Sequence, residues 1–145
     1  MESSTPPRDT AWAMSQENVN TVLAMLSAFN RGNMDGYFAS FDPEIEYHDT
    51  PGFPGPGVHH GLEAVRRHVE DYREAWVEPR VGTEEIRSVG DRVVTRVTYT
   101  GVGKSSGATA ETSASGVFDF RDGRIVRLRQ FIDHADALQA VGLSE

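Results

Sequence analysis

The chain has 145 residues, which is enough for one domain with a hydrophobic core and too few for two ordinary ones. Its 22 acidic and 14 basic residues give a formal net charge of −8, which argues against a nucleic-acid partner. Because there is no cysteine, disulfide bonds, thiolate metal ligands and a cysteine nucleophile are excluded. No apolar run approaches the roughly 20 residues of a membrane span, and the N-terminus lacks the apolar centre of a signal peptide. We therefore expect a cytoplasmic protein with no membrane partner.

The N-terminal part predicts a disordered tail followed by two helices. Residues 1–14 are rich in Ser, Thr and Pro and offer little apolar surface, which is typical of a tail. From Ser15 apolar residues recur at helical spacing, and Gly32 supplies a stop. Asn33 can cap a second, shorter helix, which Asp42-Pro43 should end.

The middle of the chain predicts a strand, a stiff loop and a third helix. Residues 44–48 alternate apolar and polar side chains over a short strand. Residues 49–60 contain three prolines and three glycines, which resist both helix and ladder and are suited to the rim of a pocket. Apolar residues from Leu62 to Trp76 then follow helical spacing, and Pro79 should end that helix.

The C-terminal half predicts an antiparallel meander. The dipeptides Gly90-Asp91 and Asp122-Gly123 tolerate the positive φ angles of tight hairpin turns. A short helix should follow the last strand over 135–141. The expected strands cover 80–89, 92–102, 109–121 and 124–133. Helices followed by a meander make the fold class α+β.

The end of the last strand holds an acid, Asp133, after largely apolar residues. If that end opens into a cavity, Asp133 is a candidate general base. If it opens to solvent, Asp133 caps the following helix. Both interpretations are compatible with the sequence.

The second face of the meander predicts a homodimer. Alternation places Val93, Val97, Tyr99 and Val117 on the face expected to point away from the helices. These side chains are too apolar to be left to water, so a second copy should cover them.

Three local strings resemble the nuclear transport factor 2-like superfamily, and its SnoaL-like (polyketide cyclase or ketosteroid isomerase-like) branch in particular. They are Asp-Pro-Glu-Ile-Glu-Tyr-His-Asp at 42–49, Gly-Leu-Glu-Ala-Val-Arg-Arg at 61–67, and Asp-Gly-Arg-Ile-Val-Arg-Leu-Arg-Gln-Phe-Ile-Asp at 122–133. The resemblance implies one domain over 15–145. It also implies a cone-shaped, curved, mostly antiparallel sheet wrapped around a long helix and a helix pair, the cystatin-like α+β roll, with a ligand-binding cavity inside.

The resemblance implies catalytic roles for four residues. Asp133 matches the strand-terminal base of SnoaL-like polyketide cyclases, and Tyr47 and Asp49 match the tyrosine and asparagine that position water in limonene epoxide hydrolases. Arg96 matches the arginine of an Arg-x-Asp pair in those hydrolases, but this chain has Thr98 in place of the second acid. Epoxide hydrolysis is therefore not expected. Arg96 could instead neutralise Asp133, which would make that pair structural or ligand-orienting and not strongly basic.

A further set of residues is expected to contact the substrate, some by resemblance and some from strand alternation. They are His48, Thr98, Thr112, Ala114, Phe118, Phe131 and Trp76. Alternation points His48 away from Tyr47, and Trp76 is equally suited to a core position. The face that carries Thr112 and Ala114 has small residues that leave room for a ligand, although it can equally face solvent.

The expected function is a cofactor-free isomerase or cyclase that uses general acid–base chemistry on a small apolar cyclic molecule. The alternatives are a noncatalytic ligand-binding protein and a dimeric assembly module. No metal is expected, because the adjacent His59 and His60 are spaced wrongly for one ion. With His68 and His134 they have the ligand types for a site, but nothing in the spacing demands one.

Overall fold

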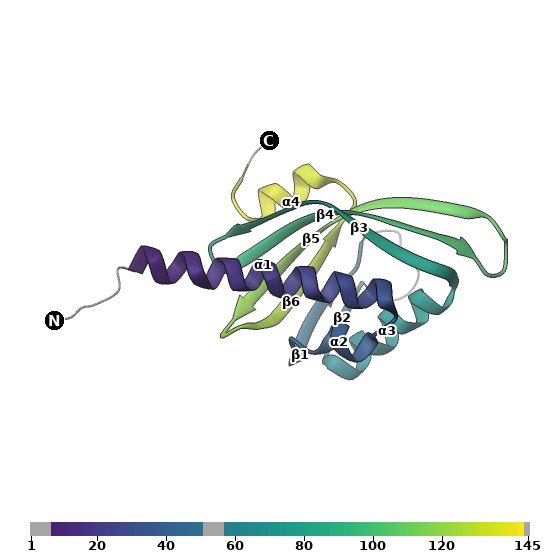
Figure 1. Ribbon diagram of the computed structural model, residues 1–145, viewed down its shortest axis with the longest axis horizontal. Helices are drawn as coiled ribbons and strands as arrows, with labels where there is room; N and C mark the ends of the chain where they lie inside the picture. The colour runs from purple at the N-terminus through teal and green to yellow at the C-terminus, as the bar shows by residue number, and fades with distance from the viewer. Residues whose placement is uncertain (1–6, 51–56, 144–145) are drawn as a thin grey trace.

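The computed structural model describes residues 7–50 and 57–143, in which four helices pack on a curved, unclosed six-stranded sheet (Figure 1). This mixed architecture confirms the predicted α+β class. The helices are α1 (Pro7–Arg31), α2 (Met34–Phe38), α3 (Leu62–Glu74) and α4 (His134–Ala140). The strands are β1 (Phe41–His48), β2 (Val58–His60), β3 (Trp76–Val89), β4 (Arg92–Gly103), β5 (Thr109–Arg121) and β6 (Arg124–Phe131).

The strand order is β2-β1-β6-β5-β4-β3. The predicted meander accounts for β3 to β6, all antiparallel, and the Asp122-Gly123 turn has the positive φ angles that its sequence predicts. β1 joins the sheet by pairing parallel with β6, and β2 pairs antiparallel with β1. Neither pairing was predicted, because both join segments separated by a loop or by most of the chain.

Two irregularities lie beside prolines in the strands. In β1 the register shifts between Phe41 and Glu46, and in β3 it shifts between Val77 and Arg80. Pro43 and Pro79 lie within these gaps and have no N–H to donate to a ladder. Both prolines were expected to end a helix. The structure corrects this, since each proline lies inside a strand that continues past it with a shift of register.

The first helix begins at Pro7 and not at Ser15. A proline is tolerated at the first helical position, because the N–H that it lacks would have no partner there. Residues 7–14 are therefore helical and not a tail, while residues 1–6 lie outside the described residues. The predicted stop is confirmed: the helix ends at Arg31 and Gly32 follows with φ of 73°.

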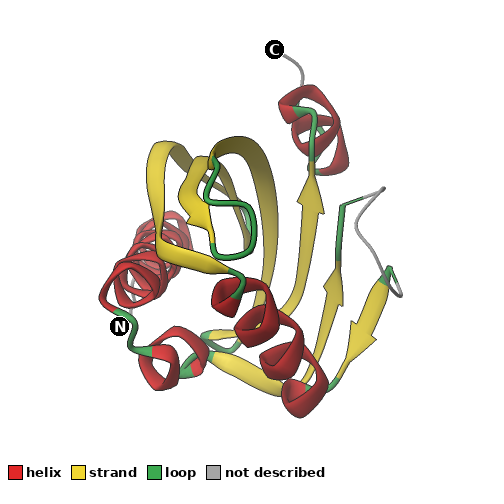
Figure 2. Cartoon of the chain, turned by 90° about the vertical axis from the view of Figure 1, so that its right-hand side faces the viewer, coloured by secondary structure: helices red, strands yellow, loops and turns green. Residues whose placement is uncertain are grey.

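The main core lies between the concave face of the sheet and the helices α1, α2 and α3 (Figure 2). It contains Val22, Phe29, Phe41, Ile45, Val65, Val93, Val97, Phe118, Ile125 and Leu128, among others. A smaller cluster lies on the opposite face, where α4 packs on Val94 and Val117. Within residues 7–50 and 57–143, no helix combines the length and apolar character needed to cross a bilayer.

The core corrects the expected assignment of the sheet faces. Val93 and Val97 are buried on the helix side, with Tyr99 packed against them, and only Val117 lies on the outer face. The apolar surface from which a homodimer was predicted is therefore already covered by this chain's own helices. The homodimer stays a prediction without that support.

Candidate functional site

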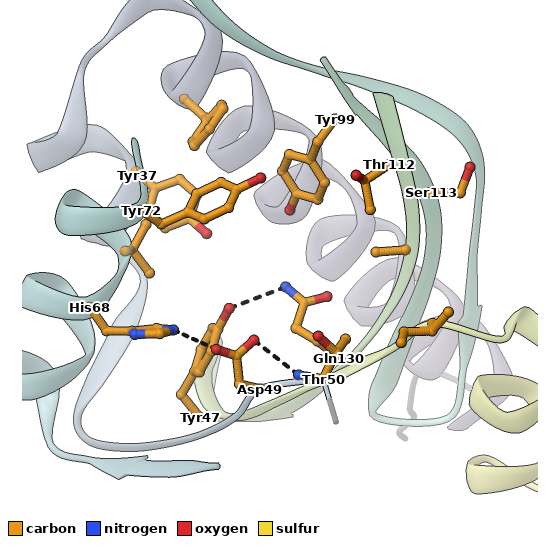
Figure 3. Close-up of a pocket in the computed structure, with 14 residues that line it drawn as sticks. Tyr37, Tyr47, Asp49, Thr50, His68, Tyr72, Tyr99, Thr112, Ser113 and Gln130 are labelled. Atoms are coloured by element: carbon orange, nitrogen blue, oxygen red, sulfur yellow. Dashed lines mark hydrogen bonds and ion pairs between the residues drawn. The ribbon is translucent and has the colours of Figure 1, made fainter. Parts of the chain in front are cut away.

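A pocket opens between α3, the end of β1 and the concave face of β4, β5 and β6 (Figure 3). Its apolar and aromatic lining consists of Phe29, Tyr37, Tyr47, Val69, Tyr72, Tyr99, Ala114 and Ile132. Its polar lining consists of Asp49, Thr50, His68, Thr112, Ser113 and Gln130. The centre of a water molecule can move through about 70 Å³ of it. A single water molecule needs about 10–15 Å³ of such space, so the pocket has room for a small organic molecule.

Tyr47 and Asp49 both point into this pocket, as strand alternation from the end of β1 requires. The backbone N–H of Asp49 donates to the carbonyl of Gly57 at 2.8 Å, and its Oδ1 accepts from the backbone N–H of Thr50 at 2.9 Å. The Asp49 side chain is only 4% exposed. A carboxylate that is fixed in place and lines a pocket is a candidate for chemistry on a bound molecule.

His68 completes an acid–base pair with Asp49. Its Nε2 lies 2.7 Å from Asp49 Oδ2, within hydrogen-bond distance (Figure 3). α3 supplies His68 from the same stripe as the buried Val65 and Val69, so the ring faces inward. His68 was not expected to line the pocket. Its position three residues after Val65, on the apolar stripe, was a signal that could have found it.

His59 lies against His68. The two rings stack with centroids 4.1 Å apart and planes 25° from parallel. His59 is the residue opposite Tyr47 in the β1–β2 ladder, so it shares the inner face of that strand pair. Nitrogen and oxygen atoms of Asp49, His59 and His68 all lie within 4.8 Å of one another, a combination that can hold a metal ion.

Four tyrosines, Tyr37, Tyr47, Tyr72 and Tyr99, line the pocket, and burial keeps their hydroxyls protonated. Burial, assisted by Tyr99 and Asp49, raises the pKa of Tyr47 far above its ordinary value. Burial also raises the pKa of Tyr99 to about 12 and the pKa of Tyr37 and Tyr72 above the ordinary value. Gln130 Nε2 donates to the Tyr47 hydroxyl at 3.5 Å. The pocket therefore offers neutral O–H donors beside a carboxylate.

Asp133 lies elsewhere. It is exposed, it is absent from the pocket lining, and its Oδ1 accepts from the backbone N–H of Ala135 at 3.0 Å. It is the N-cap of α4, so the structure supports the capping interpretation and not the base. The reason is that β6 ends at Phe131, two residues earlier than predicted, and the chain turns outward before Asp133.

Arg96 and Thr98 are on the outer face of the sheet. Arg96 is half-exposed and lies 3.8 Å from Glu84 Oε1, and Thr98 donates a hydrogen bond to Glu84 Oε2. The expectation that Arg96 and Thr98 belong to a site is wrong. Val97 and Tyr99, which alternate with them along β4, are the residues that point inward. Thr98 therefore gives no information about which acids the pocket contains.

The remaining expected contacts divide between the two faces. Thr112 and Ala114 line the pocket, as expected, while Phe118 is buried in the core below it. His48 faces away from Tyr47 with its Nε2 3.4 Å from Glu46 Oε1, and Phe131 packs with α4 on the outer face. Trp76 begins β3 instead of ending α3, and it lines a smaller neighbouring hollow. The prolines of the expected rim, within 51–56, lie outside the described residues.

Comparisons with known proteins agree with this architecture. Residues 22–128 match the family model of the SnoaL-like domain, so the chain belongs to the SnoaL-like family of the nuclear transport factor 2-like superfamily. No curated protein matches the sequence significantly.

Solved structures match over most of the chain. Bal32a, from a soil-derived mobile gene cassette, is 26% identical, with 81% of this chain and 89% of that chain covered and a TM-score of 0.73. A nuclear transport factor 2-like protein of Burkholderia thailandensis is 25% identical over 85% and 95% of the two chains, with a TM-score of 0.72. A putative SnoaL-like polyketide cyclase of Jannaschia sp. is 19% identical over 99% and 100%, with a TM-score of 0.73. This last likeness is one of fold.

Proposed function

We propose that the protein is a cofactor-free isomerase or cyclase in which Asp49, paired with His68, is the general base. The observation that carries the proposal is the 2.7 Å contact between Asp49 Oδ2 and His68 Nε2 inside a pocket lined mainly by aromatic and apolar side chains. This carboxylate is 4% exposed and lies in the pocket lining, so it is positioned to take a proton from a bound molecule. Membership of the SnoaL-like family supports the same class of chemistry.

The proposed reaction begins with removal of a proton from a carbon next to a carbonyl group. The C–H bond breaks, its electron pair enters an enolate, and Asp49 takes the proton. His68 holds the Asp49 carboxyl group in position through the contact at Oδ2. Hydrogen bonds from the Tyr47 and Tyr99 hydroxyls would stabilise the enolate oxygen, because both remain protonated near neutral pH. The pair then returns the proton to another carbon, which completes an isomerisation. In a cyclisation, the enolate carbon attacks a second carbonyl and the proton goes to the new alkoxide.

The lining supports a small, largely apolar, cyclic substrate. Phe29, Tyr72 and Tyr99 supply aromatic walls, and Tyr99 makes edge-on contacts with both of the others. Thr112 and Ala114 are small and leave space on the β5 side. Ile132 is 64% exposed and lies at the pocket mouth. Flat rings are suited to such walls because offset stacking adds to simple burial.

A noncatalytic ligand-binding protein is the second candidate. The observation that favours it is that both carboxylate oxygens of Asp49 already accept hydrogen bonds, Oδ1 from Thr50 and Oδ2 with His68. In this interpretation the pair would be a satisfied buried hydrogen bond that shapes the pocket. The two candidates differ in what removal of the charge does to turnover and to binding.

The test is exchange of α-hydrogens for deuterium in D₂O, followed by NMR over a panel of small cyclic ketones and diketones. Asp49→Asn keeps the shape of the side chain and removes the basic charge, so exchange should slow by about 100-fold or more while ligand binding survives. Asp133→Asn and His60→Ala are matched controls outside the pocket and should leave the rate unchanged. Ligand binding with no exchange by the unaltered protein would reject the enzyme and favour the second candidate.

A further inference from the structure

We propose that Asp49, His59 and His68 form a binding site for a divalent transition-metal ion of the zinc type. Two imidazole nitrogens and one carboxylate oxygen, each within 4.8 Å of the others, make up a common set of protein ligands for such an ion. The expectation of no metal rested on the adjacency of His59 and His60 in the sequence. Strand alternation turns these two side chains to opposite faces of β2, and the fold brings the His59 ring beside that of His68.

Three different elements supply the ligands. Asp49 follows β1, His59 lies on β2 across the ladder from Tyr47, and His68 comes from α3 above them. The neighbouring His60 pairs with Glu46 in the same ladder and, by alternation, faces the opposite way. His59 and His60 therefore provide one candidate ligand and one matched control in consecutive positions.

Rotations of the side chains would bring the three ligand atoms around one ion. Ligand bonds of about 2.0–2.2 Å in a tetrahedral zinc site place neighbouring ligand atoms about 3.3 Å apart. Asp49 Oδ2 and His68 Nε2 are already 2.7 Å apart, so an ion would replace the proton between them. The stacked imidazoles, 25° from parallel, would each turn about the Cβ–Cγ bond to aim a lone pair at the same point.

The surroundings support the ligands. The second carboxylate oxygen of Asp49 is held by the backbone N–H of Thr50, and the Asp49 backbone is held by Gly57. Such partners orient a metal ligand and limit its motion. Asp49 and His68 also line the pocket, so the fourth coordination position would face the space where a small molecule or water can bind.

The metal site shares Asp49 and His68 with the proposed function but does not rest on it. An ion bound there would occupy the lone pairs that a general base needs, so zinc should inhibit proton exchange if both proposals hold. Binding itself is measured without any substrate, which keeps failure of one proposal distinct from failure of the other.

The experiment is isothermal titration of the metal-free protein with Zn²⁺, together with visible absorption on titration with Co²⁺. We expect one ion per chain and a Co²⁺ spectrum with the intense bands of low-coordinate sites. His59→Ala, His68→Ala and Asp49→Asn should each weaken Zn²⁺ binding by about 10-fold or more, since loss of even a supporting partner costs 10–100-fold. His60→Ala and His48→Ala should leave the affinity unchanged.

Two results would overturn the proposal. One is an unaltered protein that takes up no Zn²⁺ in the micromolar range. The other is uptake that persists in the His59→Ala and His68→Ala variants, or that is lost in His60→Ala, because the ion would then be bound elsewhere. Should an alanine variant fail to fold, the stoichiometry and Co²⁺ spectrum of the unaltered protein still decide whether a site of this kind exists.

Discussion

Asp133 offers the sharpest separation between a role in catalysis and a role in folding. Its Oδ1 accepts from the N–H of Ala135, and the helix that it caps buries Ala137 and Leu138 against the outer face of the sheet. Asp133→Ala removes the cap, which costs about 1 kcal/mol in typical helices. For a domain of this size that corresponds to a fall in melting temperature of about 3 °C. Asp133→Asn caps nearly as well and should leave the melting temperature unchanged.

The assay is thermal unfolding followed by circular dichroism, alongside the α-hydrogen exchange rate. Both variants should keep the exchange rate, because Asp133 is exposed and outside the pocket lining. A 100-fold loss of rate in Asp133→Asn with an unchanged melting temperature would refute this reasoning. It would restore Asp133 as the base.

Two further predictions follow from the core and the tyrosines, and a third is the homodimer that the sequence led us to expect. Leu128 is fully buried, so Leu128→Ala should lower the free energy of unfolding, measured in urea, by about 2–5 kcal/mol. Val126 is half-buried, so the control Val126→Ala should lower it by less. Burial raises the pKa of Tyr99 to about 12, so the folded state holds that proton more tightly than the unfolded chain. The free energy of unfolding that this difference contributes should be fully present below about pH 10 and should be lost as the pH rises toward 12. The urea midpoint should therefore fall between about pH 9 and 11. A midpoint that does not change with pH would contradict the prediction. The homodimer should appear in light scattering as twice the chain mass of 16.0 kDa, and a single-chain mass would remove it.

Local patterns in the sequence were enough to predict most elements. Alternation and turn chemistry predicted β5 and the Asp122-Gly123 hairpin at their observed bounds, because each depends on neighbouring residues alone. The resemblance of the three quoted strings predicted the family, which the match over 22–128 confirms. Tyr47, Asp49, Thr112 and Ala114 were predicted to line a site, and all four line the pocket.

The tertiary structure alone decided which face of the sheet is the inner one and which charged residues meet there. Alternation divides a strand into two faces without saying which is buried, so Arg96 and Thr98 were expected inside and Val93 and Val97 outside, the reverse of what is found. The pairing of Asp49 with His68 spans 19 residues and needs α3 to fold over the end of β1. No local sequence pattern predicts a contact between residues this far apart in the chain. The packing of Val65 and Val69 into the core places α3 so that His68 meets Asp49.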